Sequence, residues 1–222
     1  MPNGIKLGII AMENSGKTTL ISGIKDALVV STDNKAFTGK VPHFRYSTYA
    51  GIDDFLGTLE SKIESYQDKF KKLPRTLVID SVTHLAVNME KYWNDKATGF
   101  DVWSGLGKDI TTLNAYLEDV IIPNGINVVF TSHCQFDKDT ARYTISAAGQ
   151  FGKNGSWLSV TDNASFLEVK GGKRTIHHTN AKFPCRSNLA DIPESQPIDE
   201  YDINEHIAAL EANIQESEEW TI

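Results

Sequence analysis

The chain has 222 residues, of which 40% are hydrophobic and 23% charged, and this balance excludes a disordered chain and favours one compact domain. Its net charge is −7 at pH 7, and no apolar run is long enough to span a bilayer. The first residues lack the pattern of a secretory signal, so we expect a cytoplasmic protein with no role at a membrane.

The chain opens with an apolar run and a glycine-bearing loop, within the segment GIKLGIIAMENSGKTTL (residues 4–20). A buried strand is predicted by Ile5, Leu7, Ile9 and Ile10. Gly16-Lys17-Thr18 then predicts a loop that turns into a helix, where backbone N–H groups converge on one point. This arrangement is typical of a site for the polyphosphate of a nucleotide. A chance Gly-Lys-Thr is the alternative, and the strand before it and the helix after it argue against chance.

Each residue type in this loop has a role in holding a polyphosphate. Lys17 is the flexible cation for the β and γ oxygens, and the Thr18 hydroxyl is a ligand for the Mg²⁺ that bridges them. Gly16 lets the backbone approach the phosphates. The consensus loop begins with glycine where this chain has Ala11, and alanine fits there if its φ is negative. The residues expected to bind the nucleotide are Glu13, Asn14, Ser15, Gly16, Lys17, Thr18 and Thr19.

Strands and helices alternate along the chain, as in a parallel α/β sheet. Strands are predicted at residues 27–32, 41–47, 76–80, 126–131, 166–170 and 173–179. Helices are predicted at 52–70 and 106–120, where apolar residues recur every three or four positions. Gly171-Gly172 suits a tight hairpin turn between the last two strands. We therefore predict an α/β fold with a mainly parallel central sheet flanked by helices, ending in a β-hairpin. Cys134 and Cys185 lie far apart without CxxC spacing, so neither a zinc site nor a disulfide is expected.

Polar residues follow three of the predicted strands, at the edge of the sheet where ligands bind in such folds. Asp80, after LVI, is the expected partner of Thr18 for magnesium, although an Asp here also suits a turn or a helix cap. Asp33 is the candidate general base that aligns a water against the γ-phosphate, with a turn-forming Asp as the alternative. His133 is the candidate sensor of the γ-phosphate, with a merely hydrogen-bonded His as the alternative. Lys17, Asp33, Asp80 and His133 are thus the expected catalytic residues.

The end of the chain differs in charge from the rest. Residues 191–222 contain ten acidic residues and no Lys or Arg, whereas residues 1–190 carry a net charge of +3. An amphipathic helix is predicted there by Ile203, Ile207, Leu210 and Ile214. We divide the chain into a core of residues 1–190, which is expected to bind the nucleotide, and an acidic C-terminal helix and tail of residues 191–222. The tail either packs on the core with a frayed end, or regulates a nucleic-acid site, or offers Trp220 and Ile222 to a partner.

The loop ENSGKTTL closely resembles that of the RecA-type recombinases, and the order of loop, acidic strand end, LVID strand and VVFTSH strand is similar to the RecA core. The chain looks most like the phage-encoded RecA-core ATPases that accompany strand annealing and homologous recombination. The resemblance implies a RecA-like P-loop ATPase that uses ATP and Mg²⁺ and is stimulated by DNA. It places the VVFTSH strand between the loop strand and the LVID strand, Asp33 in the catalytic-carboxylate position, and His133 where the family has a sensor glutamine.

The resemblance also implies a ring or filament of identical subunits, in which Lys173 and Arg174 supply cations to the γ-phosphate of the neighbouring subunit. Ordinary surface cations after a turn are the alternative. In RecA-like proteins the loop after the sensor strand contacts single-stranded DNA. The resemblance therefore implies that residues 134–157 form a DNA-binding loop. The expected DNA-binding residues are Lys138, Arg142, Tyr143, Phe151, Lys153 and Trp157, as cations for phosphates and rings for stacking. A solvated lid over the nucleotide is the alternative. Residues 88–107 are a second candidate DNA surface, unless their rings pack as core.

We therefore expect an ATPase that binds single-stranded DNA and assists recombination or annealing, with a single-strand-binding or replication protein as a further candidate partner. One alternative is a small-molecule phosphotransferase, which needs an Arg-rich lid that the five scattered arginines do not form. The other is a weakly hydrolysing, nucleotide-gated scaffold for a recombination or replication protein.

Overall fold

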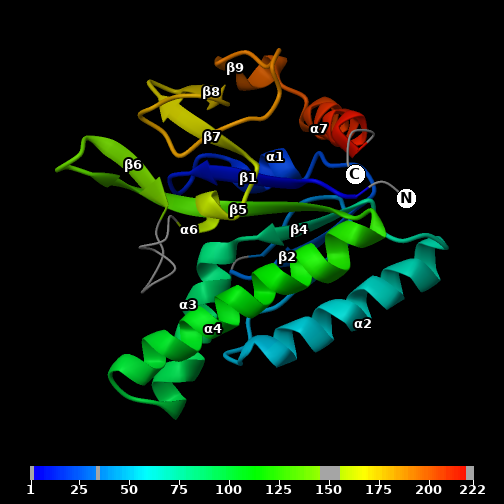
Figure 1. Cartoon of the computed structure of the whole chain (residues 1–222), viewed down its shortest axis with the longest axis vertical. Coiled ribbons are helices and arrows are strands. Elements are labelled where there is room, and N and C mark those ends of the chain that lie inside the picture. The colour runs from blue at the N-terminus through cyan, green and yellow to red at the C-terminus, as the bar shows by residue number, and fades with distance from the viewer. Residues whose placement is uncertain (1–2, 34–35, 146–155, 219–222) are drawn as a thin grey trace.

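The structure is a computed structural model that describes residues 3–33, 36–145 and 156–218. Its centre is a β-sheet with the strand order β3-β2-β4-β5-β1-β7-β8-β9, and β6 pairs with β5 outside this order (Figure 1). The strands are β1 (Lys6–Ala11), β2 (Ala27–Ser31), β3 (His43–Arg45), β4 (Thr76–Asp80), β5 (Asn127–Asp137), β6 (Arg142–Ile145), β7 (Asn163–Lys170), β8 (Lys173–His177) and β9 (Ser195–Pro197).

The strands from β3 to β7 in this order pair in parallel, whereas β7, β8 and β9 pair antiparallel at one end of the sheet. The predicted α/β fold with a mainly parallel sheet is confirmed, and β5 lies between β1 and β4 as expected. The register pairs Ala11 with His133 and Ser31 with Asp80. The carboxyl ends of the four neighbouring strands β2, β4, β5 and β1 therefore lie at one edge of the sheet. The predicted site residues lie at or directly after these strand ends.

The helices are α1 (Lys17–Ile21), α2 (Ile52–Phe70), α3 (Val82–Lys96), α4 (Phe100–Tyr116), α6 (Ser156–Ser159) and α7 (Ile203–Glu218). A π-helical turn η1 (Leu117–Ile121) and two 3₁₀ turns, η2 (Ile122–Asn124) and η3 (Ile198–Glu200), complete the described elements. The predicted helix 52–70 matches α2, and the predicted helix 106–120 is the second part of α4 with the following π-helical turn. No helix within the described ranges is long and apolar enough to cross a bilayer.

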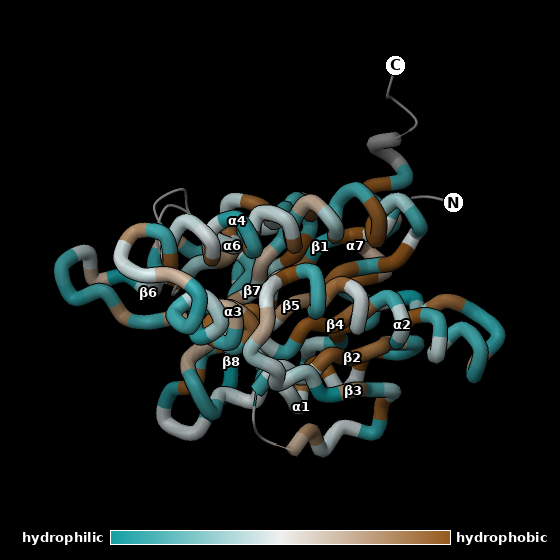
Figure 2. Tube along the Cα trace, turned by 90° about the horizontal axis from the view of Figure 1, so that it is seen from below, coloured by the Kyte–Doolittle hydropathy of each residue, from teal (hydrophilic) through white to brown (hydrophobic). Residues whose placement is uncertain are grey.

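The sheet separates two hydrophobic cores, because successive side chains of a strand point to opposite faces. On β1, Ile10 belongs to the core beneath α2, α3 and α4, whereas Ile9 belongs to the core with α1 and α7. In Figure 2 the strands β2, β4 and β5 run as hydrophobic segments between more hydrophilic surroundings. The phosphate loop thus starts from a strand that is buried on both sides.

The hairpin β7–β8 turns at Gly171 and Gly172, whose φ angles are +57° and +78°. Two consecutive left-handed residues define the tight turn that suits antiparallel strands, and glycine adopts this conformation without a steric penalty. The tight turn predicted from this glycine pair is therefore confirmed. The hairpin directs β8, and with it Arg174, back towards the phosphate loop.

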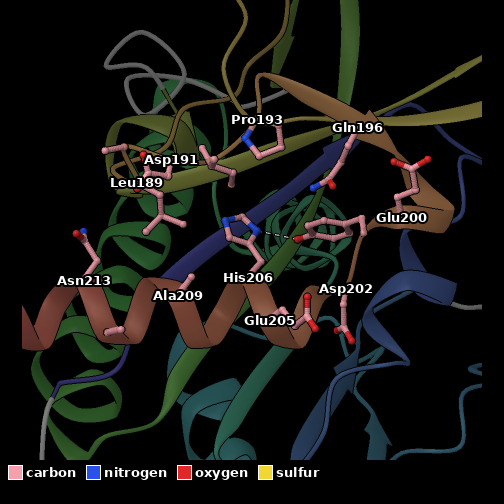
Figure 3. Close-up of a pocket in the computed structure, with 14 residues that line it drawn as sticks. Leu189, Asp191, Pro193, Gln196, Glu200, Asp202, Glu205, His206, Ala209 and Asn213 are labelled. Carbon is pink, nitrogen blue, oxygen red and sulfur yellow. Dashed lines mark hydrogen bonds between the residues drawn. The ribbon is translucent and has the colours of Figure 1, made fainter.

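The C-terminal segment from residue 191 adds to the same fold. β9 pairs with β8, and Ile203, Ile207 and Leu210 of α7 lie in the core shared with α1. Three alternatives were left open for the tail, and the structure supports the one in which its helix packs on the core. α7 and residues 189–202 enclose a hollow of about 570 Å³, which contains His206 and Tyr201 but none of the phosphate-loop residues (Figure 3).

Candidate nucleotide-binding site

The loop between β1 and α1 has the backbone conformation that its sequence requires. Ala11 is the last residue of β1 and pairs with His133, so extended backbone accommodates its methyl group where the consensus has glycine. Asn14 and Gly16 adopt positive φ angles of 57° and 100°. Glycine, and to a lesser degree asparagine, tolerates this region. The Ser15 hydroxyl donates to the Met12 carbonyl at 2.7 Å and closes the loop.

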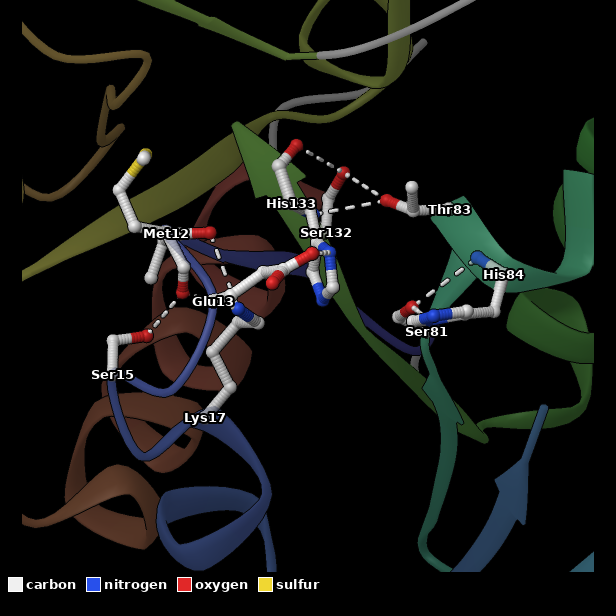
Figure 4. A network of polar contacts seen from close by, with 10 residues as sticks. Met12, Glu13, Ser15, Lys17, Ser81, Thr83, His84, Ser132 and His133 are labelled. Carbon is white, nitrogen blue, oxygen red and sulfur yellow. Dashed lines mark hydrogen bonds and ion pairs between the residues drawn. The ribbon is translucent and has the colours of Figure 1, made fainter. Parts of the chain in front are cut away.

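Lys17 lies under this loop and not in solvent. Its side chain leaves the residue only 6% exposed, and Nζ donates to the carbonyl oxygens of Ala11 at 3.2 Å and Met12 at 2.8 Å (Figure 4). A buried ammonium group needs such acceptors, because desolvation would otherwise be costly. The same donors are available to phosphate oxygens, so the charge is placed where a polyphosphate would need it.

Asp80 joins the loop to the sheet. Its Oδ2 accepts a hydrogen bond from Thr18 Oγ1 at 2.8 Å, and its Oδ1 accepts one from Thr131 Oγ1 at 2.5 Å. The carboxylate is 9% exposed, and the two hydroxyl groups determine its orientation. A carboxylate beside a hydroxyl is an oxygen-only donor set, which fits Mg²⁺ with several ligand positions left for water and phosphate. The two residues expected to hold the ion therefore lie together.

A pocket of about 380 Å³ surrounds these groups. It is lined by Glu13, Asn14, Ser15, Gly16, Lys17, Thr18, Thr19, Asp33, Asp80, Ser81, His84, His133 and Arg174. All the residues that the sequence assigned to nucleotide binding, magnesium and catalysis lie in this one pocket, although they come from three strand ends and one loop.

Asp33 is held in place through its neighbour Thr32. The Thr32 hydroxyl donates to the Ser81 carbonyl at 2.6 Å and accepts from the Ser81 N–H at 2.9 Å. The Asn88 amide also donates to the Thr32 carbonyl at 3.2 Å. The end of β2 is thereby tied to the end of β4, and Asp33 enters the pocket from an anchored backbone.

His133 is connected both to the loop and to α3 (Figure 4). Its backbone N–H donates to Thr83 Oγ1 at 2.9 Å, and its Nδ1 lies 3.8 Å from a carboxylate oxygen of Glu13. Its ring packs edge-on against His84, with 5.1 Å between ring centroids. His133 is therefore placed so that a change at Glu13 or His84 would reach β5.

His84 is a pocket residue that the sequence analysis did not single out. Ser81 begins α3 as its N-cap, accepts the His84 N–H at 3.3 Å, and has its hydroxyl 3.0 Å from His84 Nδ1. A serine directly after a strand-ending Asp predicts a helix start, and the first turn of that helix must lie at the same sheet edge. That signal would have pointed to His84.

Arg174 contacts the phosphate loop of its own chain. Its Nε donates to the Ser15 carbonyl at 3.1 Å. The resemblance assigned Arg174 to the γ-phosphate of a neighbouring subunit. The additional contact within its own chain arises because β8 lies beside β7, next to the loop strand β1. Lys173 is exposed and pairs with Lys170 beside the hairpin turn.

The expected DNA-binding segment is only partly exposed. β5 and β6 form a hairpin whose turn exposes Lys138 and Arg142. Trp157 was wrongly predicted as a stacking residue, because it is 3% exposed and packs on Phe130 with 5.4 Å between ring centroids. Tyr143 is half-buried in an aromatic cluster with Phe136, Phe166 and Phe183. The expected Phe151 and Lys153 lie outside the described residues.

The hairpin also exposes an aromatic residue that the sequence analysis missed, because the whole segment was interpreted as a loop. Phe136 on β5 is 45% exposed. Residues 88–107, the second candidate DNA surface, form most of α3 and the start of α4. The Trp93 indole there donates to Asp109 at 2.8 Å and packs between the two helices, whereas Trp103 is 44% exposed, so the rings of this segment are divided between core and surface.

The fold and the pocket define a P-loop NTPase: a parallel sheet whose first strand leads into a phosphate loop, with an acidic residue at the end of a neighbouring strand. The chain belongs to the AAA domain family, whose model matches residues 3–182. Membership of this family suggests nucleotide binding and ATPase activity. A search of curated proteins found no match.

Proposed function

We propose that this protein is a Mg²⁺-dependent ATPase that binds single-stranded DNA and assists phage-type homologous recombination or strand annealing. The observation that carries this proposal is the continuity of β5, which runs from His133 in the nucleotide pocket to Asp137 at the exposed hairpin. One strand thus joins the pocket to the surface that bears Phe136, Lys138 and Arg142. Such an element can pass a change in the pocket to a DNA-binding surface.

The residues of the pocket divide the work of hydrolysis. Lys17 exchanges its two carbonyl acceptors for phosphate oxygens and stabilises the charge that develops on them. Thr18 and Asp80 would hold Mg²⁺, which would supply positive charge to neutralise the phosphates. Asp33 aligns a water molecule and accepts its proton. The position of each side chain in the pocket and its chemistry support these roles.

His133 is the proposed sensor. Its contact with Glu13 lies at the loop, and its backbone N–H is bonded to Thr83 at the start of α3. A γ-phosphate in the pocket would compete for the same groups. A shift of His133 would move the strand that continues into the hairpin, where cations and a ring meet single-stranded DNA through phosphate contacts and stacking.

We further propose that the active form is a ring or filament of identical subunits. Lys173, exposed at the turn of β7–β8, is the side chain available to a neighbouring subunit, whereas Arg174 is engaged with its own loop. Sedimentation with ATP and an oligonucleotide should give assemblies larger than the single chain. A monomer under all these conditions would contradict this part of the proposal.

The central test is ATP turnover with and without single-stranded DNA. Stimulation by DNA is expected in the wild type and should be lost in the double variant Lys138→Ala, Arg142→Ala. The matched control is Lys62→Ala, Lys69→Ala, which removes two cations from α2 and should keep the stimulation. Equal stimulation in both double variants would exclude the hairpin as the DNA site. Stimulation by a nucleoside or nucleotide acceptor instead of DNA would favour a phosphotransferase.

A further inference from the structure

A small apolar pocket adjoins the nucleotide pocket on the side of β8 and η3. Its volume is about 260 Å³, and it is lined by Gly16, Thr19, Leu20, Leu167, Arg174 and Ile198. Gly16, Thr19 and Arg174 also line the nucleotide pocket, so the two hollows share a boundary. Whatever lies in the small pocket is therefore next to the phosphate loop.

The register of the antiparallel strands explains why these residues meet. Leu167 on β7 and Gln196 on β9 both lie opposite Ile176 on β8. Residues two positions apart on a strand point to the same face, so Arg174 shares the face of Ile176 and Leu167. Ile198 follows Gln196 by two residues, at the start of η3. The first helix after the phosphate loop, α1, covers this face with Thr19 and Leu20.

The walls of the pocket suit a flat, largely apolar ring. Leu20 and Ile198 are half-buried, so both keep apolar surface that a ligand could cover, while Leu167 is 2% exposed and forms the floor. Burial of such surface is favourable, by about 25 cal/mol per Å². A pocket with apolar walls and a few polar groups at its rim is the usual form of a small-molecule site.

Arg174 stands at the boundary between the two pockets. Its Nε is bonded to the Ser15 carbonyl, and this bond places the planar guanidinium group beside Gly16. A Cβ at Gly16 would lie 3.5 Å from that Nε, at ordinary van der Waals distance, so the loop and the arginine are direct neighbours. A guanidinium group can stack on an aromatic ring and contact a phosphate oxygen at its edge. Arg174 thus suits the junction between a base and its phosphates.

We infer that this pocket holds the base of the nucleotide and that Ile198 forms one of its walls. This inference rests on the proposed function and adds a specific site to it. Ile198 lies beyond residues 3–182, the part of the chain that matches the AAA domain family. The C-terminal segment is therefore a part of the nucleotide site, and β9 is the strand that brings it there.

Calorimetric titration of the full chain with Mg²⁺ separates base binding from phosphate binding. The two ligands are a non-hydrolysable ATP analogue, which has a base, and inorganic tripolyphosphate, which has none. Ile198→Ala should weaken binding of the analogue by about fivefold and leave the affinity for tripolyphosphate unchanged, because only apolar contact with the base is lost. Ile192→Ala, at a half-buried isoleucine of the same segment outside this pocket, is the matched control and should change neither affinity.

Leu20→Ala, on the opposite wall, should show the same pattern and serves if Ile198→Ala does not fold. Unchanged affinity for the analogue in both variants, or an equal loss for both ligands, would overturn the inference. A wild-type protein that binds neither ligand would instead contradict the proposed function itself. The two failures are therefore distinguishable.

Discussion

Thr18 on the first helical turn after the phosphate loop donates its hydroxyl to the Asp80 carboxylate at the end of β4, at a distance of 2.8 Å. The two residues are 62 positions apart in the chain, and the bond joins the loop to the centre of the sheet. Because Thr131 bonds the second oxygen of Asp80, the carboxylate is oriented before any ligand binds. Preorganised groups of this kind cost no reorganisation when charge develops in a reaction.

Asp80→Asn should raise the Mg²⁺ concentration needed for half-maximal ATPase activity and lower the maximal rate, with a smaller effect on nucleotide affinity. The reason is that the amide keeps the shape of the side chain but removes the charge that favours the ion. Turnover measured across a Mg²⁺ titration tests this. Asp139→Asn, in the exposed hairpin turn, is the control. An unaltered Mg²⁺ dependence would remove Asp80 from the metal site.

Lys17→Ala should reduce turnover by on the order of 10²-fold or more, because it removes a preorganised charge from the phosphate site. The variant also leaves the carbonyl groups of Ala11 and Met12 without their buried partner. Thermal unfolding must therefore accompany the rate measurement, so that a folded variant is compared with the wild type. Near wild-type turnover in a folded Lys17→Ala protein is incompatible with the proposed ATPase site.

Asp33→Asn should lower kcat while the affinity for ATP stays close to that of the wild type, since a general base acts on the attacking water and not on the bound nucleotide. Single-turnover kinetics and equilibrium binding measure the two quantities separately. A parallel loss of binding and turnover would assign Asp33 a structural role at the end of β2.

His133→Ala should keep nucleotide affinity and abolish the stimulation of turnover by single-stranded DNA, because β5 would lose its contact with Glu13 at the loop. Basal and stimulated rates are measured on the same preparation. His84→Ala removes the neighbouring ring but leaves the backbone bond between His133 and Thr83, so it should weaken the coupling less. Full stimulation in His133→Ala would contradict the sensor role.

The buried histidines His178 and His206 should make the free energy of unfolding depend on pH. Burial, together with the charge of His177, lowers the pKa of His178 to about 4, and burial, together with His178, lowers the pKa of His206 to about 3. Their neighbours are Ser165 and Gln196 at His178 and Tyr201 at His206. In the unfolded chain both groups titrate near 6.5, so below that pH the unfolded state binds more protons.

The stabilising contribution of the two histidines is therefore fully present above about pH 6.5 and is lost as the pH falls towards 4, by on the order of 1 kcal/mol per pH unit for each group. Urea unfolding between pH 7 and 4 measures this slope. His206→Gln should make the slope shallower, whereas His43→Gln, at an exposed histidine, should not change it. Identical slopes in the wild type and His206→Gln would show that His206 is not buried as a neutral group.

Local patterns in the sequence determined the phosphate loop, the parallel strands and the turn at Gly171-Gly172. These features depend on periodicity and backbone preference within a few residues, which a sequence displays directly. The sequence also predicted that Asp80, Asp33 and His133 lie at one edge of the sheet, since parallel strands bring their carboxyl ends to the same edge. Their distances and hydrogen bonds required the register of the sheet.

Only the tertiary structure showed which aromatic and cationic side chains are free to meet a ligand. Trp157 looked like a stacking residue beside a polar segment, but packing on Phe130 buries it, and burial depends on elements distant in the chain. Arg174 was expected to reach a neighbouring subunit, yet β8 also brings this exposed residue to the Ser15 carbonyl of its own chain, 159 residues away in sequence. The register that joins β7, β8 and β9 likewise brings Ile198 to the phosphate loop. The sequence did not predict this contact, because pairing between distant strands leaves no local signal in it.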